Sequence, residues 1–307
     1  MPKAIRFSEY GDPEVLRVEE VPLPEPGEGQ VRVKVAAAGV NGLDWKVRRG
    51  LLSGGAPLSA PMGTGLELSG VVDAVGPGAH RWRTGQAVFG GSADRGAAAE
   101  YDLAVASELV AKPDWLGFEE AAALPVATET AYRTLRLLDV RKGQTLLIHA
   151  AAGGVGLLAG QIARARGATV IGTAATRNHA FLREVGISPV LYGEGLVDRV
   201  RAMAPQGIDA VLDASGRGEL ADSVELTGSA DGVVTIADPG GAAEHGVRFT
   251  GEAGSLAEAV TEVLPLVEAG RVRMPIDSVF PLDAAADAQR RSESGHLQGK
   301  VVIRPGA

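Results

Sequence analysis

Apolar and polar residues alternate in the first ninety residues of the chain with the period of short β-strands. Val31, Val33 and Val35 alternate with Arg32 and Lys34, as expected of a strand with one buried face. Clusters of proline and glycine separate such segments and indicate turns. The pattern predicts one helix over residues 42–49 and strands over 3–7, 16–21, 31–38, 68–76 and 87–90. We therefore expect a β-rich first domain.

The pattern changes near Phe118, where a helical segment over 119–124 precedes Pro125, which is expected to end it. A second helix is predicted over 130–138. Strands and helices then alternate, which predicts a doubly wound parallel sheet. The strands are 146–150, 170–173, 190–192, 210–214 and 233–237, and the helices are 157–166, 180–185, 197–203 and 255–269.

A terminal strand over 301–304 could return to the first domain. The simplest organisation is therefore a catalytic domain split around an inserted nucleotide-binding domain. The predicted boundaries are 1–120 for its first part, 121–260 for the inserted domain and 261–307 for the return.

A glycine turn joins the first strand of the inserted domain to its first helix. Ala151, Gly153 and Gly156 follow the spacing G-x-G-x-x-G, with alanine at the first position. In such a turn the second glycine lets the backbone approach a pyrophosphate, and the third lets the helix pack on the strand. The phosphates then meet the positive end of the helix. A glycine triplet alone is weak evidence, but a strand before it and a βαβ unit around it favour a dinucleotide site over a merely structural turn.

Composition narrows the function further. The 307 residues carry a formal net charge of -8, and no cluster of basic residues offers a surface for nucleic acid. No run of apolar residues is long enough for a membrane span. Cysteine is absent, which excludes disulfides and fits a reducing, cytoplasmic location.

Four sequence blocks together resemble the medium-chain dehydrogenase/reductases, specifically their zinc-independent, quinone-oxidoreductase-like branch. They are Ala-Gly-Val-Asn-Gly-Leu-Asp at 38–44, Gly-Val-Val-Asp-Ala-Val-Gly-Pro-Gly at 70–78, Ala-Ala-Ala-Leu-Pro at 121–125 and Ala-Ala-Ala-Gly-Gly-Val-Gly at 150–156. The resemblance extends to Gly-His-Leu-Gln-Gly-Lys-Val-Val at 295–302. It implies a GroES-like catalytic domain, an inserted Rossmann domain, a nicotinamide cofactor in the cleft between them, and a homodimer.

The metal-binding residue types agree with the zinc-independent branch. Catalytic zinc in the alcohol-dehydrogenase relatives needs cysteine and histidine ligands. The histidines are scattered along the chain, at His80, His149, His179, His245 and His296. We expect no metal site and ordinary structural or surface roles for these histidines.

The choice between NAD and NADP depends on the loop after the second strand of the inserted domain. NAD sites carry an acidic residue there, whereas an arginine suits the 2′-phosphate of NADP. This loop holds Thr173, Thr176 and Arg177 and no acid, which favours NADPH. The alternative is that Arg177 only caps a surface helix. The predicted cofactor-binding residues are Ala152, Gly153, Gly154, Val155, Gly156, Thr173, Thr176, Arg177, Tyr192, Ser215, Ile236 and Ala237.

Hydride transfer needs few catalytic side chains. By motif match, Asn41 and Thr130 are the candidates for polar contacts to nicotinamide and substrate, although Asn41 could equally cap the helix that begins at Gly42. Lys46 stands where many relatives carry an aromatic residue, often tyrosine, so it is a candidate proton donor or a solvated lysine. Asp44 is expected to order the loop.

The favoured function is an NADPH-dependent reductase of quinones or α,β-unsaturated carbonyl compounds. One alternative is an enoyl reductase acting on an acyl or polyketide thioester. Its carrier would need a basic entrance, to which Arg48, Arg49, Arg81 and Arg83 could contribute, although charged surface faces explain both pairs. The other alternative is a sensor or structural protein that binds NADPH without significant turnover.

Overall fold

The computed structural model describes residues 1–252, 254–295 and 297–306, which form two compact units. Unit 1 comprises Met1–Val126, Ser255–Thr261 and the residues from Met274 to the C-terminal end; unit 2 comprises Ala127–Gly254 and Glu262–Arg273. His296, one of the scattered histidines, lies outside the described residues. The α/β class, with a parallel-sheet domain inserted in a β-rich domain, is as predicted.

Unit 1 is built on two sheets. Its strands are β1 (Lys3–Phe7), β2 (Arg17–Glu20), β3 (Gln30–Val40), β4 (Met62–Gly63), β5 (Glu67–Val75), β6 (Ala87–Ser92), β7 (Tyr101–Ala111), β14 (Ile276–Pro281) and β15 (Lys300–Arg304). Its helices are α1 (Gly42–Arg48), α2 (Phe118–Ala122) and α10 (Ala285–Glu293), with short 3-10 turns at Pro13–Val15 and Leu282–Ala284. The small sheet has the order β2-β1-β4 and the large one β14-β15-β3-β5-β6-β7.

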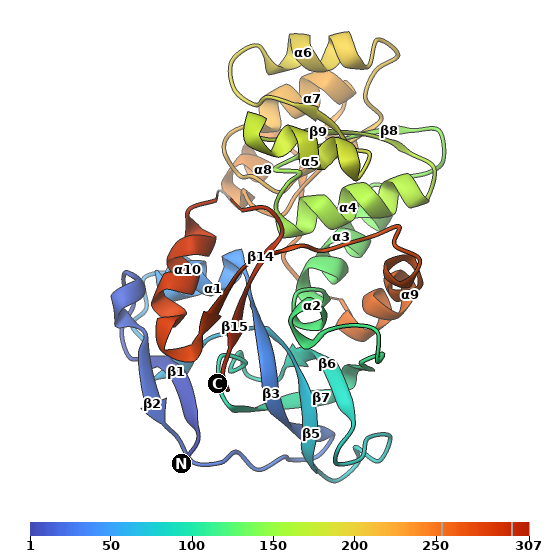
Figure 1. Cartoon of the computed structure of the whole chain (residues 1–307). Coiled ribbons are helices and arrows are strands. Elements are labelled where there is room, and N and C mark those ends of the chain that lie inside the picture. Colours follow the sequence, from blue (N-terminus) through green and yellow to red (C-terminus); the bar gives the residue numbers. More distant parts are fainter. Residues whose placement is uncertain (253, 296, 307) are drawn as a thin grey trace. The chain divides into compact units, whose positions relative to one another are not determined.

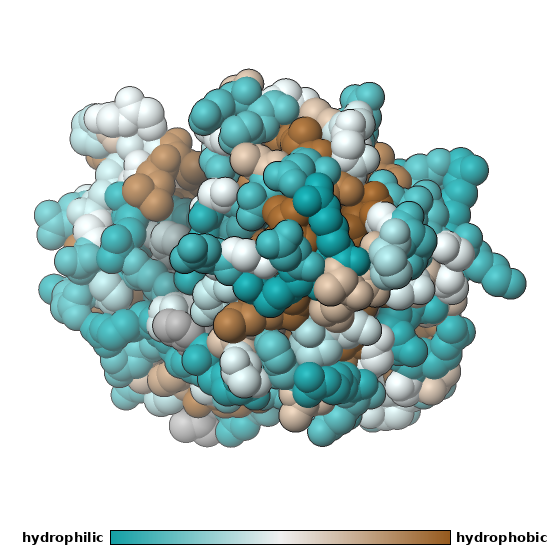
Figure 2. Space-filling model, turned by 90° about the horizontal axis from the view of Figure 1, so that it is seen from above, coloured by the Kyte–Doolittle hydropathy of each residue, from teal (hydrophilic) through white to brown (hydrophobic). Residues whose placement is uncertain are grey.

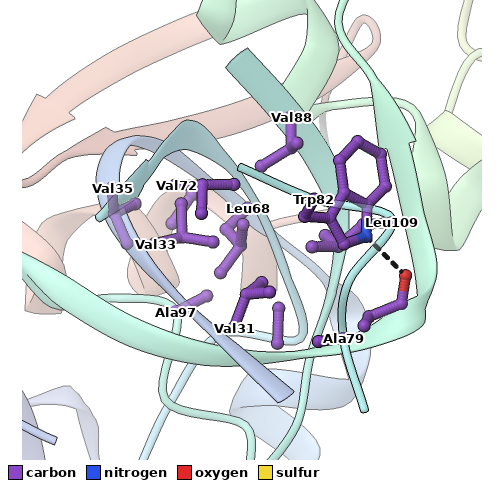
Figure 3. Packing of buried hydrophobic residues seen from close by; sticks show 13 residues of the cluster. Val31, Val33, Val35, Leu68, Val72, Ala79, Trp82, Val88, Ala97 and Leu109 are labelled. Carbon is purple, nitrogen blue, oxygen red and sulfur yellow. Dashed lines mark hydrogen bonds between the residues drawn. The ribbon is translucent and has the colours of Figure 1, made fainter. Parts of the chain in front are cut away.

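The large sheet closes on itself because β3 pairs with β7 as well as with β5. Strands β3, β5, β6 and β7 lie side by side in Figure 1. Their inward side chains form a core that includes Val31, Leu68 and Leu109, shown in Figure 3. At its margin the Trp82 indole Nε1 donates a hydrogen bond of 2.8 Å to the carbonyl of Ala106. The polar edge of this large side chain is thereby satisfied within the apolar core.

The pattern of apolar residues gave no indication of strand β7. Its buried side chains include Asp102, Ala104 and Ala106, whereas Val105 points outward and is exposed. Before Leu109, small and acidic residues thus occupy the inner face of the strand, which inverts the usual alternation there. Strand β14 and helix α10 were not predicted either.

The C-terminal strand returns to unit 1, as predicted. Strand β15 pairs antiparallel with β3, where Val301 lies opposite Val40 and Ile303 opposite Ala38. It also pairs in parallel with β14. The strand brings Lys300 next to the end of β3, which positions the candidate site described below.

Unit 2 holds the parallel sheet. Its strands are β8 (Thr145–His149), β9 (Thr169–Thr173), β10 (Ser188–Val190), β11 (Ala210–Asp213), β12 (Val233–Thr235) and β13 (Arg248–Phe249), in the order β10-β9-β8-β11-β12-β13. Its helices are α4 (Gly154–Ala165), α5 (His179–Glu184), α6 (Leu196–Met203), α7 (Leu220–Thr227) and α8 (Pro239–His245), with 3-10 turns at Thr176–Asn178 and Ala230–Gly232. Helices α3 (Pro125–Leu137) and α9 (Leu256–Glu268) each have residues in both units.

Helices cover both faces of the parallel sheet, so its strands are apolar on both sides. Leu147 and Val211 share one core cluster with Leu196 of α6 and Leu220 of α7. Ile148, the next residue along β8, faces Gly160 of α4. The run Leu146–Ile148 is accordingly fully buried, as the sequence indicated.

Two predicted boundaries in this region are wrong. The helix before Pro125 ends ahead of it as predicted, since α2 stops at Ala122, but the next helix was expected from residue 130. Instead Pro125 begins α3, where its missing N–H costs nothing because the first turn of a helix leaves its amides unbonded. Strand β10 ends at Val190, so Tyr192 lies beyond it rather than at its end.

Figure 2 shows a face on which hydrophilic side chains dominate and hydrophobic ones form patches between them. None of the helices in the described ranges has the length and hydropathy that a membrane span requires.

The buried carboxyl of Asp102 makes the stability of unit 1 depend on pH. Burial raises its pKa from 3.8 to about 7. Between these values the group is ionised in the unfolded chain and neutral in the folded one, so the folded state binds more protons. The free energy of unfolding should therefore fall by a few kcal/mol as pH rises from about 4 to about 7, at about 1.4 kcal/mol per pKa unit.

Urea unfolding of the wild type and Asp102→Asn, followed by tryptophan fluorescence, checks this prediction. The three tryptophans, Trp45, Trp82 and Trp115, all lie in unit 1. The variant should lose the slope between about pH 6 and 7 and keep below pH 6 the part that the buried Asp44, whose pKa is raised to about 6, also supplies, whereas Asp283→Asn, an exposed aspartate of the same unit, should keep the whole slope. Equal slopes in all three proteins would contradict the assignment.

Candidate functional site

The glycine turn between β8 and α4 has the geometry expected of a phosphate-binding loop. Ala150 has a left-handed backbone with φ of 59°, and Gly153 is the N-cap residue of α4. Ala152 is buried, whereas Gly153, Gly154 and Val155 are partly exposed. The first turn of α4 thus presents unpaired amides next to accessible backbone.

The two glycines of the turn are required for different reasons. A Cβ on Gly156 would lie 2.5 Å from the Ala150 carbonyl oxygen and 2.9 Å from the Ala151 Cα, so only glycine lets α4 pack this closely on the turn. At Gly153 the nearest atom to such a Cβ is the same carbonyl oxygen, at 3.5 Å, which is an ordinary contact. The fold itself therefore tolerates a side chain at Gly153, and a close approach by a ligand would explain the glycine.

Thr173 orders the turn from the neighbouring strand. Its hydroxyl accepts a hydrogen bond of 3.1 Å from the Ala150 amide, and its carbonyl accepts one of 3.0 Å from the Ala151 amide. The side chain is buried, so it acts on the shape of the turn.

A second buried acid organises the same edge of the sheet. The Asp213 carboxylate accepts hydrogen bonds from the amides of Ser215 and Gly216 and from the Thr235 hydroxyl, the last at 2.7 Å. The Thr235 hydroxyl in turn accepts from the Ala237 amide. One carboxylate therefore fixes the loops after both β11 and β12.

These loops hold three of the predicted cofactor residues. Ser215, Ile236 and Ala237 are partly exposed at the carboxyl ends of β11 and β12, where doubly wound sheets bind their ligands. The Ser215 hydroxyl lies 2.9 Å from both carboxylate oxygens of Glu219, to which it donates. The parallel sheet thus brings these residues to the edge that carries the glycine turn.

The loop after β9 leaves a cationic side chain available. Thr176 and Arg177 lie in a 3-10 turn and are exposed, and among the described residues no partner of the Arg177 guanidinium is found. Tyr192, after β10, is 41% exposed. Arg177 therefore does not cap a helix through a hydrogen bond and is free to meet an anion.

His149 has a partner that the sequence did not indicate. It is fully buried at the end of β8, and its Nε2 lies 3.0 Å from the Ser223 hydroxyl of α7. That hydroxyl donates to the carbonyl of Glu219, so the histidine Nε2 must be the donor toward it. Burial lowers the pKa of His149 and keeps the ring neutral.

Unit 1 contributes a buried cluster of polar side chains around Asn41. The Asn41 Oδ1 accepts a hydrogen bond of 2.5 Å from the Lys300 ammonium, and its Nδ2 donates one of 2.8 Å to Oε1 of Glu67. Lys300 and Glu67 also form an ion pair at 2.6 Å. The other Glu67 oxygen accepts from the Val126 amide at the start of α3.

Asp44 orders the loop before α1, as expected. Its carboxylate accepts hydrogen bonds from the amides of Asn41, at 2.7 Å, and Gly65, at 3.2 Å. Asn41 is therefore the N-cap residue of α1 by position, while the side chain that bonds the backbone is that of Asp44. Burial raises the pKa of Asp44 to about 6.

The other candidates lie in different surroundings. Lys46, in α1, is partly buried with its ammonium 5.8 Å from the centre of the Trp45 ring. Thr130, in α3, is partly buried, and its backbone carbonyl accepts a hydrogen bond from the Thr134 hydroxyl. Arg48 belongs to neither a basic entrance nor a charged surface, because it is fully buried and paired with Glu293 at 2.7 Å.

Sequence reasoning missed Glu67, Lys300 and the organising role of Asp213. A usable signal was present, because each is a charged residue at the first or last position of its strand, next to a run of apolar residues or directly before a buried leucine. Charged residues are rarely fully buried unless they are paired. The sequence alone could not pair Glu67 with Lys300, which lie 233 positions apart.

Comparison with known proteins identifies the family. Residues 27–119 match the alcohol dehydrogenase GroES-like domain, and residues 188–303 match a family described as zinc-binding dehydrogenase. A quinone oxidoreductase of Lama guanicoe is 34% identical, with 98% of this chain and 97% of the relative covered.

Solved structures agree. The quinone oxidoreductase of Coxiella burnetii superposes with a TM-score of 0.89 at 33% identity, covering 99% of each chain. The Escherichia coli quinone oxidoreductase complexed with NADPH gives a TM-score of 0.86 at 28% identity, covering 99% of this chain and 100% of the other.

Fold and relatives together place the chain among the NAD(P)H-dependent oxidoreductases of the medium-chain dehydrogenase/reductase superfamily. Within that superfamily it belongs with the quinone-oxidoreductase-like members, as the sequence blocks predicted.

Separate substitutions of the two turn glycines should lower the stability of unit 2 to different extents. Gly156→Ala should destabilise unit 2 by about 1–3 kcal/mol, because a backbone carbonyl cannot yield to the added methyl group. Gly153→Ala should cost less than about 1 kcal/mol, the difference between the two residues at an N-cap. Circular dichroism melting of both variants measures this order, and the reverse order would contradict the packing argument.

Proposed function

We propose that this protein is an NADPH-dependent, zinc-independent reductase of quinones or α,β-unsaturated carbonyl compounds. The observation that carries the proposal is the pairing of an open glycine turn, at Gly153, with a free arginine, Arg177, beyond the next strand. The relatives named quinone oxidoreductase support the substrate class.

The residues of unit 2 fit a nicotinamide dinucleotide. Backbone amides at Ala152–Gly156 would hold the pyrophosphate, and Thr176 and Arg177 would hold the 2′-phosphate, with Thr173 keeping the turn in shape. Tyr192, Ser215, Ile236 and Ala237 would line the path of the nucleotide. When bound, NADPH supplies the hydride.

The residues do not fit a catalytic zinc ion, although one matched family is described as zinc-binding. The chain has no cysteine, and the part of it that the structure describes contains no group of three histidine, aspartate or glutamate side chains able to hold a metal. Zinc sites need three or four such ligands together.

The protein's own part in the chemistry is positioning and charge stabilisation. Reduction of an enone or quinone places negative charge on a carbonyl oxygen, which a preorganised hydrogen-bond donor stabilises. We propose that Asn41 and Thr130 supply polar contacts to the nicotinamide and the substrate. Lys46, held near the Trp45 ring, or bulk water delivers the proton.

We also propose a cytoplasmic homodimer. The absence of cysteine fits a reducing compartment. The edge strand β13 carries Phe249, which is 44% exposed, and an exposed apolar edge is suited to pairing with a second copy.

Arg177→Ala should separate the two nucleotides. A hydrogen-bonded charge pair contributes about 1.5–3 kcal/mol, so NADPH affinity should fall by about ten- to hundredfold while NADH affinity stays constant. Isothermal titration calorimetry measures both. Arg183→Ala, a nearby exposed arginine in α5, is the control and should bind both nucleotides like the wild type. If the variant kept its affinity for both nucleotides, or lost affinity for both equally, the NADP assignment would be wrong.

Oxidation of NADPH by purified protein with panels of quinones, enones and enoyl thioesters tests the reaction itself. Turnover of quinones or free enones, unchanged after treatment with a chelator, is the expected result. Preference for the thioesters would favour an acyl or polyketide enoyl reductase instead. Tight NADPH binding without oxidation would indicate a sensor or structural protein.

A further inference from the structure

Both polar ends of the Asn41 amide are held by buried charged groups. Lys300 is in contact with the oxygen, and Glu67 is in contact with the nitrogen. An ammonium only donates hydrogen bonds and a carboxylate only accepts them, so the amide has one possible orientation. One Nδ2 hydrogen is used by Glu67, and the second has no acceptor among the residues that the structure describes, so it is the donor that the amide has left. Asn41 as a whole residue is 8% exposed, so it is not entirely closed off from solvent.

The surrounding fold is built to hold this arrangement. A Cβ on Gly39 would lie 2.4 Å from Oε1 of Glu67 and 2.5 Å from the Ala122 carbonyl, so β3 can pass the carboxylate only with glycine there. The second Glu67 oxygen is fixed by the Val126 amide at 2.7 Å. The Glu67 side chain is fully buried and that of Lys300 is 5% exposed.

Stability alone does not account for such an ion pair. Burying two charges costs solvation energy that their attraction often fails to recover, and replacement by apolar residues of similar volume is often neutral or stabilising. Conformational specificity is the property that a buried pair can supply instead. Here the group whose conformation it specifies is Asn41.

We propose that Lys300 and Glu67 are positioning residues that fix Asn41 as a hydrogen-bond donor, so that the ligand group facing it must be an acceptor, the carbonyl oxygen of a quinone or enone. This inference rests on the proposed function and names the substrate feature that the site selects. As charge develops on that oxygen, an amide held in one orientation stabilises it without first having to reorient. An alcohol hydroxyl offered as donor would find no acceptor on this amide.

The orientation can be tested without turnover. The chain has two asparagines, Asn41 and Asn178, so labelling with [15N]asparagine gives two pairs of side-chain amide signals, and Asn178, in unit 2, is the internal control. In the wild type the Asn41 hydrogen bonded to Glu67 should exchange slowly with solvent. Lys300→Met should speed this exchange and shift both Asn41 signals while leaving Asn178 unchanged. Unchanged Asn41 signals would overturn the proposal.

The kinetic consequence is tested by a double-mutant cycle of Lys300→Met and Asn41→Ala. Each single variant should lower kcat for a quinone or enone by about tenfold or more, as loss of an oriented donor does. The NADPH dissociation constant should change less than about twofold, because unit 2 holds the nucleotide. The double variant should be no slower than Asn41→Ala alone, because Lys300 acts only through that amide. Additive losses in kcat would show an independent role and overturn the proposal.

Two further proteins keep the result interpretable. Lys34→Met, the same substitution at an exposed position of β3, should behave like the wild type in both experiments. Should Lys300→Met fail to fold, Glu67→Gln keeps the shape of the side chain and should loosen the Asn41 amide in the same way. If the wild type turns over no quinone or enone, the proposed function fails, while the labelled amide still decides whether Lys300 and Glu67 orient Asn41.

Discussion

Unit 1 depends on how its buried Glu67 carboxylate is satisfied. An ionised carboxylate removed from water is tolerated only when donors surround it. Here they come from three other places in the chain, the Asn41 amide before α1, the Val126 amide in α3 and the Lys300 ammonium in β15. Lys300 arrives last along the chain. The barrel strands can pair earlier, but the polar interior of unit 1 is complete only when β15 has paired with β3.

Unit 2 also contains a buried carboxylate that is surrounded by hydrogen-bond donors. The Asp213 carboxylate is fully buried and is satisfied by two backbone amides and the Thr235 hydroxyl. In both units an acid at the end of a rigid strand collects the donors of the adjacent loops. Loops that would otherwise sample many conformations are thereby held where a ligand could meet them, which is the arrangement that precise sites need.

Features that depend on a few neighbouring residues of the chain could be predicted from the sequence. The glycine turn, the buried strand before it and the acid-free loop at Arg177 depend on neighbours along the chain, and the structure has them as expected. The terminal strand also returns as predicted. Strand β7 could not be found, because its inner face carries Asp102 and alanines while Val105 faces out. The start of α3 at Pro125 was not predicted, because a proline that marks the end of one helix can also be the first residue of the next.

The contacts of Asn41 were beyond sequence reasoning for another reason. Its motif suggested a helix cap, a ligand contact or both, and neither role involves a buried ion pair. In the structure Asp44 bonds the backbone at the helix start, which releases the Asn41 side chain for Lys300 and Glu67. Neither partner could be identified without knowing that β15 lies beside β3.

A neutral amide backed by a paired cation and anion has a chemical advantage over a bare charged donor. An unpaired lysine would attract any anion. It would bind an oxyanion product as firmly as it stabilises the transition state, and such uniform binding does not raise kcat. The Lys300 charge is balanced by Glu67 at 2.6 Å, so what remains toward the ligand is an oriented dipole. Such a dipole discriminates by geometry and by acceptor strength rather than by net charge, and this is the selectivity that a reductase of uncharged carbonyl compounds requires.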